Sequence, residues 1–172
     1  MFGLSLFQSN ACFAFSWQGM GGKETSVGVG AHYHVALSQL EHTDFDDSYL
    51  SYLTGVKFRL NYQWTIDAVL EYYPGKDDIS CILSPRISIL RGKGFYFGTG
   101  IEKKYVKLES GESNWNDETY LVQAGFEVPF GSKNALNIDA YYGLEKLSDI
   151  TDIISDFDSD NLTFGIRLYR YF

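Results

Sequence analysis

The chain has 172 residues, which suits one domain with a sizeable core. Hydrophobic residues make up 45% of the sequence and charged residues 21%, which excludes an intrinsically disordered chain. The net charge of -8 argues against nucleic acid as a partner, because phosphate binding needs a basic face. The chain has 2 cysteines, which excludes a disulfide framework and a cysteine-rich zinc site.

The N-terminal residues, MFGLSLFQSNACFAFS, are apolar and carry no charge. Their last three residues, Ala14-Phe15-Ser16, have the small-x-small pattern of a signal-peptidase site. The sequence therefore predicts a signal-peptide remnant at residues 1–16 and a single β-barrel domain at residues 17–172. The alternative for residues 1–16 is a mature N-terminal segment that packs on the domain. No other stretch reaches the roughly 18 consecutive apolar residues of a membrane-spanning helix.

From residue 24 onward, apolar residues recur with a period of two, as in strands with one apolar face. In the first such segment, Val27, Val29 and Tyr33 fall on one face, and His32 and His34 fall on the other. The pattern predicts strands at residues 26–37, 50–60, 64–72, 79–89, 95–105, 120–130, 136–144 and 162–172. Each has about nine residues or more, the length that a tilted strand needs to cross a bilayer.

The connections between these strands alternate in length. The short ones are predicted at residues 61–63, 91–94 and 131–134, and the mostly longer ones at 38–48, 74–78, 107–117 and 145–160. An up-and-down meander with an even number of strands gives this asymmetry, and it closes into a barrel without a free edge. The sequence therefore predicts an all-β fold, an eight-stranded antiparallel up-and-down barrel.

The polar strand faces carry charges deep within the strands, with positive and negative side chains in equal number. This balance is what an enclosed interior requires, because an unpaired buried charge is costly. We therefore predict a lumen charge network of Lys57, Arg59, Asp67, Glu71, Arg86, Glu102, Lys104, Glu127, Asp139 and Arg167. The short connection at residues 61–63 sets Lys57 opposite Asp67. An interior eight strands wide is just filled by side chains, so a wide channel is not expected.

If the polar faces line the lumen, the apolar faces point outward against lipid, and the barrel is transmembrane. Glycines on the polar faces favour this orientation, because a narrow lumen needs small residues beside its long charged ones. The alternative is a soluble lipocalin-like barrel, whose apolar face surrounds a ligand.

The chain resembles the small eight-stranded outer-membrane barrels of the OmpX, OmpA transmembrane-domain and opacity-protein type. The resemblance rests on strand number, loop asymmetry and the ending LTFGIRLYRYF. In that family, the final Phe and alternate apolar residues before it form the signal that the barrel-assembly machinery reads. Arg170 departs from this pattern, in which an apolar or aromatic residue is usual. The residues that match the assembly signal are Phe164, Ile166, Leu168 and Phe172.

The resemblance implies the outer membrane of a Gram-negative-type bacterium, with outer-membrane lipid, lipopolysaccharide and the assembly machinery as partners. It also implies that the longer connections, which carry most of the acidity, face outside the cell. We therefore expect a non-catalytic membrane barrel whose acidic loops serve surface interaction or adhesion with an extracellular partner. The alternative is that these loops are solvated and favour solubility.

Few residues suggest a metal-binding or catalytic role. His32 and His34 point to the same side of one strand, about 6–7 Å apart. With a nearby carboxylate they could bind zinc or another divalent metal, and the alternative is that they are hydrogen-bonded members of the polar interior. Asp156, Asp158 and Asp160 have the spacing that opens a calcium loop, but its Gly and distant Glu are absent.

A lipid A-modifying enzyme is a further alternative, because some eight-stranded outer-membrane barrels are deacylases or palmitoyltransferases. The deacylases resemble one another in a His-x-Ser pair, and this sequence has none. We therefore expect no catalytic residue and no cofactor.

Overall fold

The computed structural model describes residues 24–35, 49–76, 78–146, 149 and 157–172. The predicted signal-peptide remnant at residues 1–16 and the first long connection at 38–48 lie outside them. Among the described residues, no helix has the length and apolar character that crossing a membrane requires.

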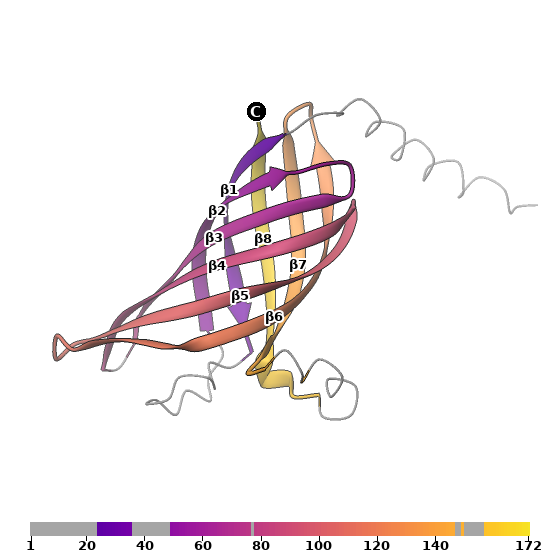
Figure 1. Cartoon of the computed structure of the whole chain (residues 1–172). Coiled ribbons are helices and arrows are strands. Elements are labelled where there is room, and N and C mark those ends of the chain that lie inside the picture. Colours follow the sequence, from indigo (N-terminus) through magenta and orange to yellow (C-terminus); the bar gives the residue numbers. More distant parts are fainter. Residues whose placement is uncertain (1–23, 36–48, 77, 147–148, 150–156) are drawn as a thin grey trace, which may run out of the picture.

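Eight antiparallel strands close into a barrel in sequence order, with β1 paired to β8 (Figure 1). This confirms the predicted eight-stranded up-and-down barrel. The strands are β1 (Thr25–His34), β2 (Tyr49–Arg59), β3 (Trp64–Lys76), β4 (Ile79–Lys93), β5 (Phe95–Leu108), β6 (Ser113–Phe130), β7 (Asn134–Leu144) and β8 (Leu162–Tyr171).

The alternation of side chains decides which residues line the lumen. In β8 every second residue from Thr163 to Tyr171 is buried, and the residues between them are exposed. The buried set includes Arg167, whereas the exposed set includes Ile166 and Leu168. The polar face therefore points inward and the apolar face outward, so the lipocalin-like alternative, which needs the opposite orientation, does not hold.

Large apolar side chains are exposed on the outside of the whole barrel wall. Each strand contributes at least one of them, for example Val29, Tyr52, Leu70, Ile87, Phe97, Phe126, Ile138 and Ile166. The wall thus presents a continuous apolar surface around the barrel.

The short turns lie at the end of the barrel where the C-terminus is found, and we call it the turn end (Figure 1). Gly94 alone joins β4 to β5, and its φ of 78° is in the left-handed region that glycine adopts without strain. The opposite end carries the connections that follow β1, β3, β5 and β7, and we call it the loop end.

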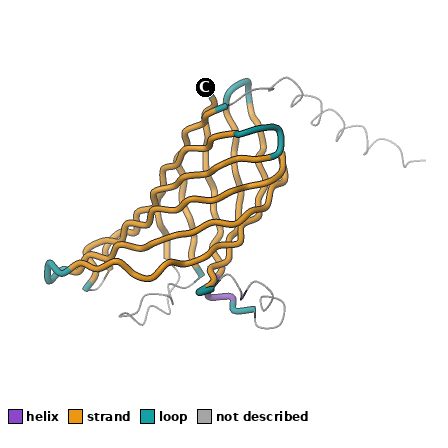
Figure 2. Tube along the Cα trace, in the orientation of Figure 1, coloured by secondary structure: helices purple, strands orange, loops and turns teal. Residues whose placement is uncertain are grey.

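Two loop-end connections are shorter than predicted. Residues 74–78 and 107–117 were expected as loops, but β3 continues to Lys76 and β6 begins at Ser113. The polar stretch 113–119 has no apolar face that would mark it as a strand, yet it pairs with β5. The pairing of β6 with β7 begins only at Tyr120 and Leu144, so the β5–β6 hairpin protrudes beyond the closed wall (Figure 2).

Candidate functional site

The ten predicted charged residues all lie on the inner face of the barrel. Arg59 is half-buried and the other nine are buried. They come from every strand except β1, which instead contributes His32 and His34 to the lumen. The charges form clusters along the barrel axis.

The central cluster is built around the fully buried Arg167. Its Nη1 atom donates to Asp67 Oδ2 at 2.7 Å and to the Tyr169 hydroxyl at 2.7 Å. Its Nη2 atom donates to Asp139 Oδ2, which also accepts from Gln123 Nε2 at 2.9 Å. One guanidinium from β8 thus joins carboxylates of β3 and β7, in a place where an unpaired charge would be costly.

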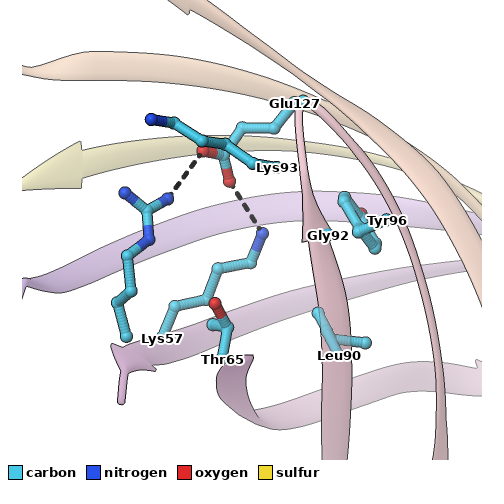
Figure 3. Close-up of a pocket in the computed structure, with 9 residues that line it drawn as sticks. Lys57, Thr65, Leu90, Gly92, Lys93, Tyr96 and Glu127 are labelled. Atoms are coloured by element: carbon cyan, nitrogen blue, oxygen red, sulfur yellow. Dashed lines mark hydrogen bonds and ion pairs between the residues drawn. The ribbon is translucent and has the colours of Figure 1, made fainter. Parts of the chain in front are cut away.

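The turn-end cluster is built around Glu127. Lys57 Nζ lies 3.2 Å from Glu127 Oε2 (Figure 3). Arg59 Nη2 lies 3.4 Å from Glu127 Oε1. Arg59 Nη1 also pairs with Glu24 at 3.0 Å, and the Tyr171 hydroxyl donates to Glu127 at 2.5 Å. Lys57, Arg59 and Glu127 line a cavity of about 20 Å³, enough for about one water molecule. The lumen is narrow here.

The predicted placement of Lys57 opposite Asp67 is confirmed, although it does not make the two side chains an ion pair. The backbone register does set these residues opposite each other. However, Lys57 Nζ pairs with Glu127, and Nζ lies over the ring of Tyr169, 4.4 Å from its centroid. Asp67 pairs with Arg167 instead. In a narrow lumen, long side chains reach across the barrel, so adjacency on neighbouring strands does not decide the partner.

Arg86, Glu102 and Lys104 form a further group on β4 and β5. Arg86 is opposite Glu102 in the ladder, and Lys104 Nζ lies 3.1 Å from Glu102 Oε1. The Arg86 guanidinium lies over the ring of Tyr141 at 4.5 Å, with Nη1 4.0 Å from Glu71 Oε2. This group connects the charge network to the loop end.

The loop-end cluster consists of His32, His34, Ser51, Glu71, Tyr141 and Thr163, all buried. His32 Nδ1 lies 3.0 Å from Glu71 Oε2 and 3.1 Å from the Tyr141 hydroxyl. His34 Nε2 lies 2.8 Å from Glu71 Oε1 and 2.9 Å from Ser51 Oγ. Two imidazoles from β1 therefore face one carboxylate from β3.

The sequence prediction did not include Ser51, Tyr141 or Thr163 as members of this cluster. All three alternate with outward apolar residues, so their inward orientation could be inferred. Their convergence on the histidines depends on the relative offsets of β1, β2, β7 and β8, which alternation does not specify.

The same cluster bears on the enzyme alternative. Ser51, His34 and Glu71 are a nucleophile, a base and a carboxylate within contact distance. However, Ser51 and Glu71 both contact Nε2 of His34, whereas the far nitrogen, Nδ1, faces Thr163 Oγ1 at 2.9 Å. A triad needs the carboxylate on that far nitrogen, and Ser51 is enclosed by the barrel. This geometry does not favour a hydrolase acting on lipid outside the wall.

The aspartates with calcium-loop spacing are described only in part, because Asp156 lies outside the described residues. Asp158 caps the short 3₁₀ turn η3 (Ser159–Asn161), and its Oδ1 accepts from the Asp160 backbone N–H at 3.0 Å. This Asp158 carboxylate oxygen is therefore already engaged in a hydrogen bond within the turn.

The four residues matched to the assembly signal, Phe164, Ile166, Leu168 and Phe172, are all exposed. The first three lie on the outer face of β8, and Phe172 follows this strand. Arg170 is also exposed and lies opposite Asn134 at the turn end of β7. A long side chain at this end can extend from the wall toward water.

No protein-family model and no curated protein matches the chain in sequence. Among solved structures, it is similar to the N-terminal β-barrel domain of Pseudomonas aeruginosa OprF, with 13% sequence identity and a TM-score of 0.56. That match covers 89% of this chain and 100% of the OprF domain. The chain is also similar to Neisserial surface protein A, with 10% identity, a TM-score of 0.50, and coverage of 87% of this chain and 96% of that one. The chain therefore has the fold of the small eight-stranded outer-membrane barrels.

Proposed function

We propose that this protein is an integral outer-membrane β-barrel without catalytic activity, in a Gram-negative-type bacterium. The observation that carries the proposal is the orientation of the wall, with apolar side chains outside on all eight strands and the lumen charge network inside. Lipid is the solvent that makes this arrangement favourable, because it covers the apolar surface while the closed barrel satisfies the backbone hydrogen bonds.

The size of the outward apolar surface supports the proposal. Val29, Phe126 and Ile166 remain 58%, 57% and 51% exposed, and their neighbours around the wall are similar. The largest apolar patch on a typical water-soluble monomer covers only about 300–600 Å², whereas the apolar surface here runs around the whole barrel.

The interior supports a filled barrel rather than a wide pore. Arg167, Lys57 and Arg59 are each paired with a carboxylate, and tyrosine rings pack beside them. Such ion pairs fix the side chains in the lumen, so the barrel serves as a rigid membrane anchor.

The proposal includes the partners implied by the family resemblance. Outer-membrane lipid and lipopolysaccharide would surround the wall. The assembly machinery would recognise the outward apolar residues at the end of the chain, of which Phe172 is 74% exposed. Surface interaction or adhesion would fall to the loop end, where the acidic residues Glu145, Asp158 and Asp160 are exposed.

The orientation is tested by refolding the chain in detergent and comparing its gel mobility with and without boiling, together with protease treatment of intact cells. We expect a compact band that boiling shifts, and cleavage confined to the loop-end connections. A chain that stays soluble and monomeric without detergent would contradict the membrane assignment.

The adhesion role is tested by neutralising loop-end carboxylates, with Glu145→Gln, Asp158→Asn and Asp160→Asn combined in one variant. We expect reduced binding of the expressing cells to a surface coated with a basic protein, with unchanged barrel expression. A matched control replaces the turn-end cations Arg91 and Lys133 with Gln. Equal binding by cells that express the unchanged protein, the carboxylate variant and the control variant would contradict a role of these carboxylates in adhesion.

A further inference from the structure

The loop-end cluster has the donor set of a transition-metal site. One donor atom from each of His32, His34 and Glu71 lies within 4.8 Å of the other two. Two imidazole nitrogens and a carboxylate oxygen are ligands that Zn²⁺ binds at about 2.0–2.2 Å. At these bond lengths tetrahedral ligands are about 3.4 Å apart, so the His–Glu separations of 2.8 and 3.0 Å need to open by only about half an ångström.

Both histidines are positioned to bind through the nitrogen that faces Glu71. A ligating histidine normally donates its other ring N–H to an oxygen that fixes the tautomer. The far nitrogen of His34 has Thr163 Oγ1 at 2.9 Å, and the far nitrogen of His32 has Asp139 Oδ1 at 3.9 Å. The Thr163 oxygen is within hydrogen-bond distance and would hold the His34 ring in the tautomer that a metal requires. Asp139 Oδ1 is too far away for a hydrogen bond, but it and the far nitrogen of His32 are both buried without a hydrogen-bond partner among the described residues, so a movement of about 1 Å would pair them.

The structure offers further oxygen donors for the remaining coordination position. Ser51 Oγ lies 2.9 Å from the ligating nitrogen of His34, and the Tyr141 hydroxyl lies 3.1 Å from that of His32. Either oxygen, or a water between them, would complete a four-coordinate set.

Space for the His32 ring depends on Gly165, its register partner on β8. A Cβ atom at this position would lie 2.5 Å from His32 Cδ2 and would also collide with Asp139 Oδ1. The absence of a side chain at Gly165 therefore leaves room for the His32 ring and the Asp139 carboxylate to lie side by side.

We propose that His32, His34 and Glu71 form a binding site for a divalent transition metal of the zinc class, which joins β1 to β3 across β2 at the loop end of the lumen. In the metal-free state, a ring hydrogen of each histidine lies between its imidazole and Glu71, in the space that the metal would occupy. Metal binding moves each ring hydrogen to the far nitrogen, toward Thr163 and Asp139.

Zinc-class ions suit this site better than calcium or magnesium. Hard cations require six or more oxygen ligands, or several retained waters, whereas two of the donors here are imidazole nitrogens. The Arg86 guanidinium, 4.0 Å from Glu71 and opposite Glu102 in the ladder, adds a positive charge nearby.

The experiment uses the untagged full chain, stripped with a chelator and refolded in detergent, with Zn²⁺ as the probe. Zinc is supplied either during refolding or afterwards, because the site is enclosed, and bound zinc is measured by competition with a coloured chelator. We expect one Zn²⁺ per chain in at least one of these two conditions. The absence of stoichiometric zinc in both conditions would overturn the proposal.

Variants identify the ligands. We expect His32→Ala and Glu71→Gln each to weaken zinc affinity by more than about 100-fold. Thr163→Val, which removes the oxygen beside the far nitrogen of His34, should weaken zinc affinity by about 10–100-fold. The controls are His42→Ala, which removes the remaining histidine, and Thr54→Val, which replaces an outward-facing threonine. Each variant must retain the boiling-dependent gel shift of the folded barrel. Binding that survives in His32→Ala, or is lost in His42→Ala alone, would overturn the assignment.

Histidine side-chain ¹⁵N spectra of the unmodified chain give a readout that requires no variant to fold. We expect zinc to shift Nδ1 of His32 and Nε2 of His34 to metal-bound values, while the opposite nitrogens become protonated. Shifts confined to His42 would contradict the proposal. Because zinc binding and membrane insertion are measured separately, failure of one leaves the other intact.

Discussion

Arg167 and Asp67 are 100 residues apart in the sequence, and their side chains meet at 2.7 Å inside the barrel. They belong to β8 and β3, which are not neighbours in the sheet. The contact therefore spans the lumen rather than the wall. Since Arg167 also holds Asp139, its guanidinium neutralises carboxylates from two directions.

Removal of the Arg167 charge should therefore be among the most damaging changes to the lumen. We expect Arg167→Met to destabilise the barrel by about 3–5 kcal/mol, because Asp67 and Asp139 would be left buried without their cation. Urea unfolding of the detergent-folded protein, followed by tryptophan fluorescence, measures the loss.

A double-mutant cycle between Arg167→Met and Asp67→Asn should give a coupling energy of about 0.5–3 kcal/mol. The matched control is the cycle between Lys57→Met and Asp67→Asn, whose residues face each other in the ladder but pair elsewhere. We expect the control coupling to be smaller. A larger coupling for Lys57 would show that adjacency in the ladder, not contact across the lumen, decides the pairing.

Gly165→Ala should disturb the space between β8 and the loop-end cluster. The added Cβ collides with Asp139 and the His32 ring, and both are enclosed by other side chains. We expect a loss of about 1–3 kcal/mol, typical of overpacking. The control Ile166→Leu changes the adjacent outward residue at nearly constant volume and should cost less. Equal losses for the two variants would indicate that the His32 ring can move aside.

The barrel follows from the sequence because alternation is a local property. In β8, the order Phe164, Gly165, Ile166, Arg167 already separates outward from inward residues, and short connections fix neighbouring registers such as Lys57 with Asp67. Strand ends are less predictable when they protrude, because Trp115 is the sole apolar side chain in residues 113–119, and one such residue gives no period-two signal.

The candidate site could be predicted only in part. The sequence indicates that His32, His34 and Glu71 are inward, but not that they meet, since β2 lies between β1 and β3. Their contact depends on strand tilt and on how far each side chain reaches into the lumen. The same dependence explains why Lys57 pairs with Glu127 and not with its ladder neighbour.

The outer wall should reject charge. Ile138 is 50% exposed on β7, and Ile138→Arg should destabilise the protein in lipid vesicles by about 2–4 kcal/mol if the residue is near the bilayer midplane. The matched variant Ile138→Leu keeps the position apolar and should cost less than about 1.5 kcal/mol. A loss below about 0.5 kcal/mol for Ile138→Arg would contradict contact between this face and lipid.

The protruding β5–β6 hairpin offers a test of electrostatics in water. Lys103 and Glu118 are register partners beyond the closed wall, with Nζ 2.9 Å from Oε1 and both side chains exposed. The hydrogen bond from Lys103, together with its positive charge, lowers the pKa of Glu118. A lowered folded-state pKa stabilises the hairpin at pH values above the unfolded-state pKa, and this contribution is lost as the pH falls through the folded-state pKa.

We therefore expect Lys103→Gln to raise the pKa of Glu118 toward its ordinary value, as followed by carboxyl ¹³C NMR. High salt should produce a shift in the same direction, because solvent and ions screen an exposed pair. Lys107→Gln is the control, since Lys107 is opposite Ser113 and not opposite Glu118. If Lys103→Gln leaves the Glu118 titration unchanged, the ion pair does not persist in solution, and the hairpin is held by its backbone ladder and by the contact between Tyr105 and Trp115.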